Sequence, residues 1–146
     1  MITAWLCRFF AFLAAVGFCL AVAWHVAALG GPDLSWPRDP YQLVYGSLFV
    51  WGPALVILSP FRDMFAMGDL SRYEEVVRGA PKPLVAIAII ASIYALVAFF
   101  SFSRQRADVS LSAFAMAIYA LGFVIHWAAA RRAAARLDSD PSKGAA

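Results

Sequence analysis

The chain has 146 residues, of which 63% are apolar and only 14% are charged. A soluble domain of this size carries a far more charged surface, so the composition excludes that class and indicates an integral membrane protein. The formal charge of +3 comes from basic residues that are scattered rather than clustered, which argues against a nucleic-acid partner.

All charged side chains fall outside four uncharged runs of 21 to 24 residues, at 9–32, 40–61, 83–103 and 109–130. A helix needs roughly 20 residues to cross the hydrocarbon core, at about 1.5 Å per residue. The sequence therefore predicts an all-α membrane protein with four transmembrane helices in an antiparallel up-down bundle. The spans are expected at about 9–30, 41–60, 83–103 and 109–130, within a single domain at 1–137.

The basic residues predict the orientation, because Lys and Arg are retained on the cytoplasmic side. Nine of them lie before the first run, between the second and third runs, or after the fourth, whereas Arg38, Arg104 and Arg106 lie in the other connections. We therefore expect a multi-pass protein of the cell inner (plasma) membrane with both termini in the cytoplasm. Membrane lipids, through their anionic headgroups, are the expected partners.

The first run also has features of a signal peptide, with Arg8 before it and a small-residue site at 21–23. The apolar run continues past that site to Leu29, which is longer than a signal peptide needs, so we expect a retained anchor. Small side chains on this helix would let a neighbouring helix approach closely. They are Ala11, Ala14, Ala15 and Gly17.

The second run is interrupted by Pro53, which has no amide hydrogen for the Phe49 carbonyl. A kink about midway along the helix is expected there. In a membrane the freed carbonyl must find another donor, a water or a cavity. This helix is therefore either the wall of a binding site or a helix kinked only for packing, which is the commoner reason for a membrane proline.

The long connection between the second and third runs contains a short helix signal at about 71–79. Ser71 and Glu74 form a capping box, and Gly79 and Pro81 supply the stop. We expect a short amphipathic cytoplasmic helix on the membrane surface, serving as a docking surface for a partner protein or as a solvated connector. The last residues, 138–146, are predicted to be a disordered tail.

The third and fourth runs carry stripes of small residues at helical spacing, which predict close packing against neighbouring helices. The fourth helix is expected to continue past the membrane to Leu137. The stripes are Ala88 with Ser92, then Ala91, Ala95 and Ala98, then Ala113, Ala117 and Ala120.

Two histidines, His25 and His126, are weak candidates for a metal site, because imidazole is the usual axial ligand of membrane haems. The predicted four-span topology places them in opposite halves of the membrane. Their separation along the membrane normal is roughly 17 Å, at about 1.5 Å per residue. One iron within a protomer is thereby excluded, although a homodimer would bring them together. Each histidine adjoins a tryptophan, as interfacial anchors do. We expect no metal and no cofactor.

Three hydrogen-bonding aromatic residues, Trp51, Tyr94 and Tyr119, each fall near the middle of their runs. Lipid offers them no partner, so they should face inward. With the kink at Pro53 they form a candidate midplane pocket for an isoprenoid, quinone or lipid-like ligand. The alternative is an aromatic core whose polar atoms bond to backbone carbonyls.

No catalytic apparatus is visible: there is no Ser-His-Asp set at a plausible depth, no CxxC pair and no phosphate-binding glycine loop. The two cysteines, Cys7 and Cys19, are interpreted as small packing residues. The protein is therefore predicted not to be an enzyme but an accessory or assembly subunit that binds other membrane proteins through alanine-lined helix faces. The alternative is a small homo-oligomeric transporter or channel for a neutral or apolar solute.

Overall fold

The computed structural model describes residues 2–30, 40–58, 73–102 and 106–138, and no strand occurs among them. The all-helical fold expected from the apolar runs is confirmed over these residues. Ser71 and nearly all of the expected tail lie outside them. The helices are α1 (Ile2–Ala28), α2 (Pro40–Gly46), α3 (Leu48–Ile57), α5 (Tyr73–Val77), α6 (Lys82–Phe102) and α7 (Ala107–Asp138).

Within the described parts of the chain, three helices are long and apolar enough to cross a membrane, over Thr3–Ala28, Lys82–Phe102 and Ala107–Arg136. They match the first, third and fourth predicted spans. Their outer surfaces agree with this, since large apolar side chains such as Phe12 and Phe100 are exposed. A surface of this kind is an aggregation liability in water and is favourable in hydrocarbon.

The second predicted span, 41–60, is divided into two shorter helices. α2 ends at Gly46 and α3 begins at Leu48, and the hydroxyl of Ser47 between them donates to the Val44 carbonyl. This break differs from the midway kink expected at Pro53, because α3 continues through that proline. The interruption is slight, since Ser47 keeps helical dihedral angles (φ −64°, ψ −23°) and its carbonyl accepts from the Trp51 N–H at 2.9 Å. At this point α2 lies close to α7, because a Cβ on Gly46 would be only 2.8 Å from the Tyr119 hydroxyl.

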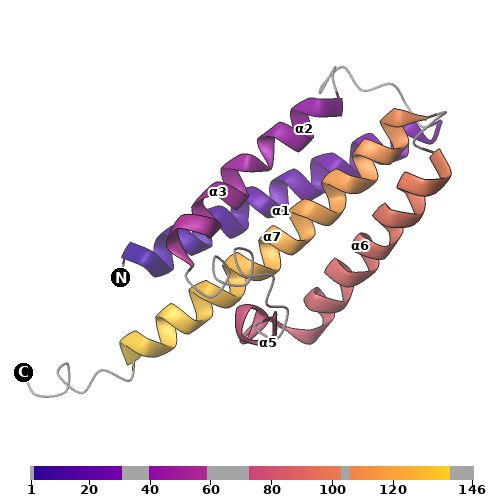
Figure 1. The fold of residues 1–146 in the computed structure, drawn as a ribbon. Coiled ribbons are helices and arrows are strands. Elements are labelled where there is room, and N and C mark those ends of the chain that lie inside the picture. Colours follow the sequence, from indigo (N-terminus) through magenta and orange to yellow (C-terminus); the bar gives the residue numbers. More distant parts are fainter. Residues whose placement is uncertain (1, 31–39, 59–72, 103–105, 139–146) are drawn as a thin grey trace, which may run out of the picture.

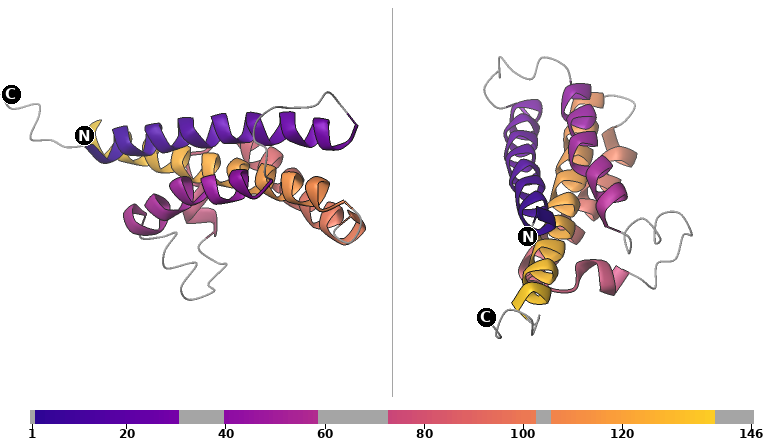
Figure 2. Two further views of the ribbon diagram at one scale, coloured as in Figure 1. Left: turned by 90° about the horizontal axis from the view of Figure 1, so that it is seen from above. Right: turned by 90° about the vertical axis from the view of Figure 1, so that its left-hand side faces the viewer.

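Helix α7 lies at the centre of the bundle, where α1, α2, α3 and α6 all pack against it (Figure 1). α1 and α6 run in one direction along the bundle, and α2, α3 and α7 run in the other. The first turn of α1 and the last turn of α7 therefore lie at the same end. In the two further views α7 lies between α1 and the α2–α3 pair (Figure 2).

The small-residue stripes predicted from the sequence form the helix interfaces. Ala14 of α1 and Ala113 of α7 are completely buried, and the α6 stripe packs on α7. The close-packing role predicted for these alanines is confirmed. These buried alanines therefore form contacts between helices of this chain. The buried members include Ala11, Ala14, Ala88, Ala91, Ala95, Ala98, Ala113, Ala117 and Ala120.

Candidate functional site

A buried hydrogen-bonded cluster joins α1, α6 and α7 near the end of α1. His25 is only 6% exposed. Its Nε2 lies 2.7 Å from the Tyr94 hydroxyl on α6, and its Nδ1 lies 2.8 Å from the Ser112 Oγ on α7. The Tyr94 ring also meets the imidazole edge to face, with centroids 5.3 Å apart. One imidazole therefore links three helices.

The partners of Ser112 fix the direction of these hydrogen bonds. The Ser112 hydroxyl donates to the Asp108 carbonyl at 2.8 Å, with the Val109 carbonyl at 3.0 Å. Its oxygen is then an acceptor for His25, so Nδ1 of His25 carries the hydrogen. Nε2 of His25 consequently accepts from the Tyr94 hydroxyl. The neutral imidazole is fully satisfied in this tautomer, as a buried polar group must be.

Beside this cluster, Arg106 closes the end of the bundle. Its guanidinium donates to the Ala28 carbonyl at the end of α1 and pairs with the Asp108 carboxylate at 3.2 Å. The last carbonyls of a helix have no partner within the helix, so Arg106 supplies one for α1. The α1 and α7 ends are tied together by this contact.

The second histidine, His126 on α7, is fully buried near the other end of the bundle. Its Nε2–H donates to the Val50 carbonyl of α3 at 2.8 Å, and its ring lies against Phe10 of α1. Nδ1 has no hydrogen-bond partner among the described residues. Both histidines are therefore buried in the bundle and bonded to protein groups, and their interpretation as interfacial anchors stays a prediction.

The two imidazoles are not arranged for a shared metal. Ser112, the partner of His25, is separated from His126 along α7 by a rise of about 21 Å at roughly 1.5 Å per residue. Among the described residues, no group of three or more His, Cys, Asp or Glu side chains is placed to hold a metal ion. The bonding of each histidine is instead explained by protein partners.

The four pocket candidates lie in two different places. The Trp51 Nε1–H donates to the Ile118 carbonyl at 3.3 Å, and Tyr119 is buried with it between α1, α3 and α7. Pro53 is half-buried two residues along from Trp51 in α3. Tyr94 is separate from them, because it bonds to His25. The structure thus brings Trp51 and Tyr119 together in a packed core.

Two glycines explain how that core packs so closely. A Cβ added to Gly17 would lie 2.3 to 2.6 Å from ring atoms of Tyr119, so α1 accepts that ring only because residue 17 has no side chain. A Cβ on Gly122 would lie 2.6 Å from Val50, so α3 approaches α7 by the same means. The space beside Tyr119 is filled by backbone.

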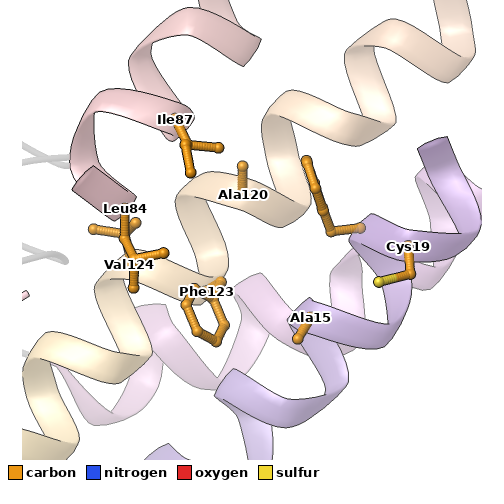
Figure 3. A pocket seen from close by; sticks show the side chains of 8 residues that line it. Ala15, Cys19, Leu84, Ile87, Ala120, Phe123 and Val124 are labelled. Atoms are coloured by element: carbon orange, nitrogen blue, oxygen red, sulfur yellow. The ribbon is translucent and has the colours of Figure 1, made fainter. Parts of the chain in front are cut away.

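A cavity of about 180 Å³ lies elsewhere, between α1 and α6, with α7 as its floor (Figure 3). Its lining is apolar and includes none of the four predicted pocket residues. The sequence interpretation missed it, since Cys19 was taken only as a packing residue and its thiol is in fact exposed at this cavity. The lining side chains are Ala15, Phe18, Cys19, Leu84, Ile87, Ala120, Phe123 and Val124.

The cavity and the polar cluster share the same three helices. Cys19 and His25 are on α1, and Ile87 and Tyr94 are on α6 two turns apart. The His25–Tyr94 bond therefore bridges α1 and α6 about 10 Å along the bundle from the cavity, at roughly 1.5 Å per residue. At only about 180 Å³, the cavity is smaller than the roughly 300 Å³ and more of pockets that enclose whole ligands.

Comparison of the chain with known protein families, with curated proteins and with solved structures finds no match.

Proposed function

We propose that the protein crosses the inner membrane four times, with both termini in the cytoplasm. α2 and α3 together supply the remaining crossing, since residues 40–57 rise about 27 Å at roughly 1.5 Å per residue, close to the thickness of the hydrocarbon core. The first turn of α1 and the last turn of α7 lie at one end of the bundle, which supports a shared side (Figure 1). The nine basic residues in the connections and termini of that side favour the cytoplasm.

Within that membrane the protein acts without catalysis, as an accessory or assembly subunit that binds another membrane protein. The observation that carries this role is the apolar cavity between α1 and α6. Its wall and floor include the small residues Ala15 and Ala120, and it is partly open rather than enclosed. Small residues at such a place let a foreign transmembrane helix approach closely.

The rest of the exposed surface has a different character. The outward face of α6 carries large side chains such as Ile90, Leu96 and Phe100, each more than half exposed. Bulky branched and aromatic side chains of this kind suit contact with lipid tails. The cavity is therefore the better place for a partner helix than the α6 face.

The alternative, a homo-oligomeric transporter or channel, receives less support. Its proposed gate, at the level of Trp51 and Tyr119, is filled by the packing of Tyr119 on Gly17. A solute path would therefore have to run between copies of the chain.

Site-directed photo-crosslinking in native membranes tests the role. A photoactivatable amino acid replaces Cys19 in the cavity, and in a second protein it replaces Phe100 on the outward face of α6. We expect position 19 to give a defined heterologous membrane-protein adduct, and position 100 to give lipid adducts. The Ala15→Phe variant should abolish the position 19 adduct by filling the cavity, whereas Ala23→Phe, at an exposed α1 residue outside the cavity lining, should not.

Two other results would count against the proposed accessory role. An adduct of the chain with itself at position 19 would favour the homo-oligomeric transporter or channel. Lipid adducts alone at both positions would contradict a partner helix in the cavity. The membrane orientation is tested separately, with reporters fused before residue 1 and after residue 138, both of which should be active in the cytoplasm.

A further inference from the structure

A second hollow, of about 380 Å³, lies between α5 and the first turns of α6. It is at the end of the bundle away from His25 and on the same side as the last turns of α7 (Figure 1). Charged side chains of Glu74, Arg78 and Lys82 line one part of it. The other part is apolar and extends along α6. The hollow therefore combines a charged region with a hydrocarbon-like wall.

The backbone around the hollow is held in place by α7. Gly79 has a φ of +96°, a conformation that favours glycine, and it turns the chain from α5 towards Lys82. The Arg132 guanidinium of α7 donates to the carbonyls of Glu75 and Val76 at 2.9 Å and of Arg78 at 2.8 Å. These bonds cap the end of α5. The segment that carries Arg78 is thereby fixed against the bundle.

The charged part of the hollow favours an anion. Arg78 and Lys82 contribute two positive charges against the one negative charge of Glu74, and all three residues are exposed. Over the part of the chain that the structure describes, neither cation forms an ion pair. A negatively charged group would thus meet two cations that form no ion pair with any other described residue.

The apolar part distinguishes a lipid from a free anion. Val85, Ala86 and Ile89 line the hollow along the first turns of α6. Val85 also packs against the α6–α7 core, so this wall is fixed, while Ile89 remains 44% exposed towards the surroundings. A free phosphate gains nothing from such a wall, whereas a phospholipid has an acyl chain to lay along it.

We propose that this hollow binds one anionic phospholipid, with its phosphate between Arg78 and Lys82 and an acyl chain along α6. Basic pockets at the cytoplasmic ends of membrane helices recognise anionic headgroups through charge complementarity. The cytoplasmic source of the lipid rests on the proposed orientation, because anionic lipids are enriched in that leaflet. The binding itself does not depend on the orientation.

Native mass spectrometry of the delipidated full-length protein in mild detergent tests the site. Dioleoylphosphatidylglycerol and dioleoylphosphatidylcholine are titrated separately. Glycerol 3-phosphate, which has the phosphate but no acyl chain, is added as a competitor. We expect one molecule of phosphatidylglycerol to bind in preference to phosphatidylcholine, and glycerol 3-phosphate not to compete at millimolar concentration. The double variant Arg78→Gln/Lys82→Gln should bind phosphatidylglycerol at least about tenfold more weakly, because each basic residue at an anionic headgroup contributes on the order of fivefold.

Matched variants distinguish binding in this hollow from general attraction between the lipid and the protein's positive charge. Arg8→Gln removes an exposed cation of α1 that does not line the hollow, and it should leave the affinity unchanged. Glu74→Gln should strengthen binding. Equal weakening by Arg8→Gln, or binding by the double variant equal to that of the unmodified chain, would overturn the proposal. Competition by glycerol 3-phosphate would also overturn it, in favour of a free-anion site. Because the assay uses detergent, a failure of the proposed orientation alters none of these results.

Discussion

The Tyr94 hydroxyl of α6 donates to Nε2 of His25 on α1 across 2.7 Å. Both helices pack on α7 and line the apolar cavity, and this bond connects them directly, about 10 Å along the bundle from that cavity at roughly 1.5 Å per residue. Because Ser112 accepts from the other imidazole nitrogen, loss of either partner leaves a buried nitrogen unsatisfied. The cluster thus connects three apolar helices through hydrogen bonds between buried polar side chains.

The Tyr94→Phe variant tests this hydrogen-bonded connection. It removes only the hydroxyl, and we expect a loss of about 1 kcal/mol in the free energy of unfolding, the usual size of a hydrogen bond between membrane helices. Unfolding in a mixed-micelle denaturant titration measures it. Tyr45→Phe, at an exposed α2 residue, is the control and should be neutral. In a His25→Ala background the Tyr94 substitution should have little further effect, and an additive loss would show that the two residues are not coupled.

A second prediction concerns the glycine contact of Tyr119. Gly17→Ala places a methyl group within 2.6 Å of the Tyr119 ring, which is buried in the apolar cluster between α1, α3 and α7. We expect destabilisation of about 1–3 kcal/mol from overpacking. Gly52→Ala is the matched control, since a Cβ there meets nothing within 4 Å. It should be neutral or slightly stabilising in the helix. Equal thermal midpoints for the two variants would refute the close-packing account.

The sequence predicted the helix faces well and their relative positions less well. The alanine stripes could be found because their spacing is a local property of one helix, as Ala91, Ala95 and Ala98 show. Trp51 and Tyr119, which the sequence placed near the middle of their own runs, lie near one another on α3 and α7. These features need no knowledge of which helix lies beside which.

The partners of Tyr94 could not be predicted in this way. Centring every span at one depth put Tyr94 in the membrane middle and His25 nearer the outer surface, yet the two side chains are bonded. α6 is therefore displaced along its axis relative to α1, and no single-helix pattern encodes such a displacement. The cavity beside Cys19 depends on the same relative placement of α1 and α6. For this reason the sequence located neither feature.

A third prediction follows from the packing of α6 on α7. At their shared ends the interface consists of four buried alanines, Ala95, Ala98, Ala113 and Ala117. Ala113→Leu inserts three carbon atoms where no space exists, and we expect about 1–3 kcal/mol of destabilisation with separation of the helices. Distances between spin labels on α6 and α7 should increase. Ala135→Leu, at an exposed residue near the end of α7, should leave them unchanged, and unchanged distances in Ala113→Leu would contradict the assigned interface.

A fourth prediction concerns Arg132, whose guanidinium caps the end of α5 through three carbonyls. Arg132→Gln removes these charge-assisted bonds, while Val76 still packs in the apolar cluster with Ile125. We expect α5 to open locally rather than the bundle to unfold, with backbone amides at 76–80 exchanging on the order of fivefold to tenfold faster with solvent deuterium. Hydrogen-exchange mass spectrometry measures this by segment. Arg131→Gln changes the neighbouring, exposed arginine and should leave exchange at 76–80 as it was. If both variants, or neither, accelerated that exchange, the cap would not be what holds α5 on α7.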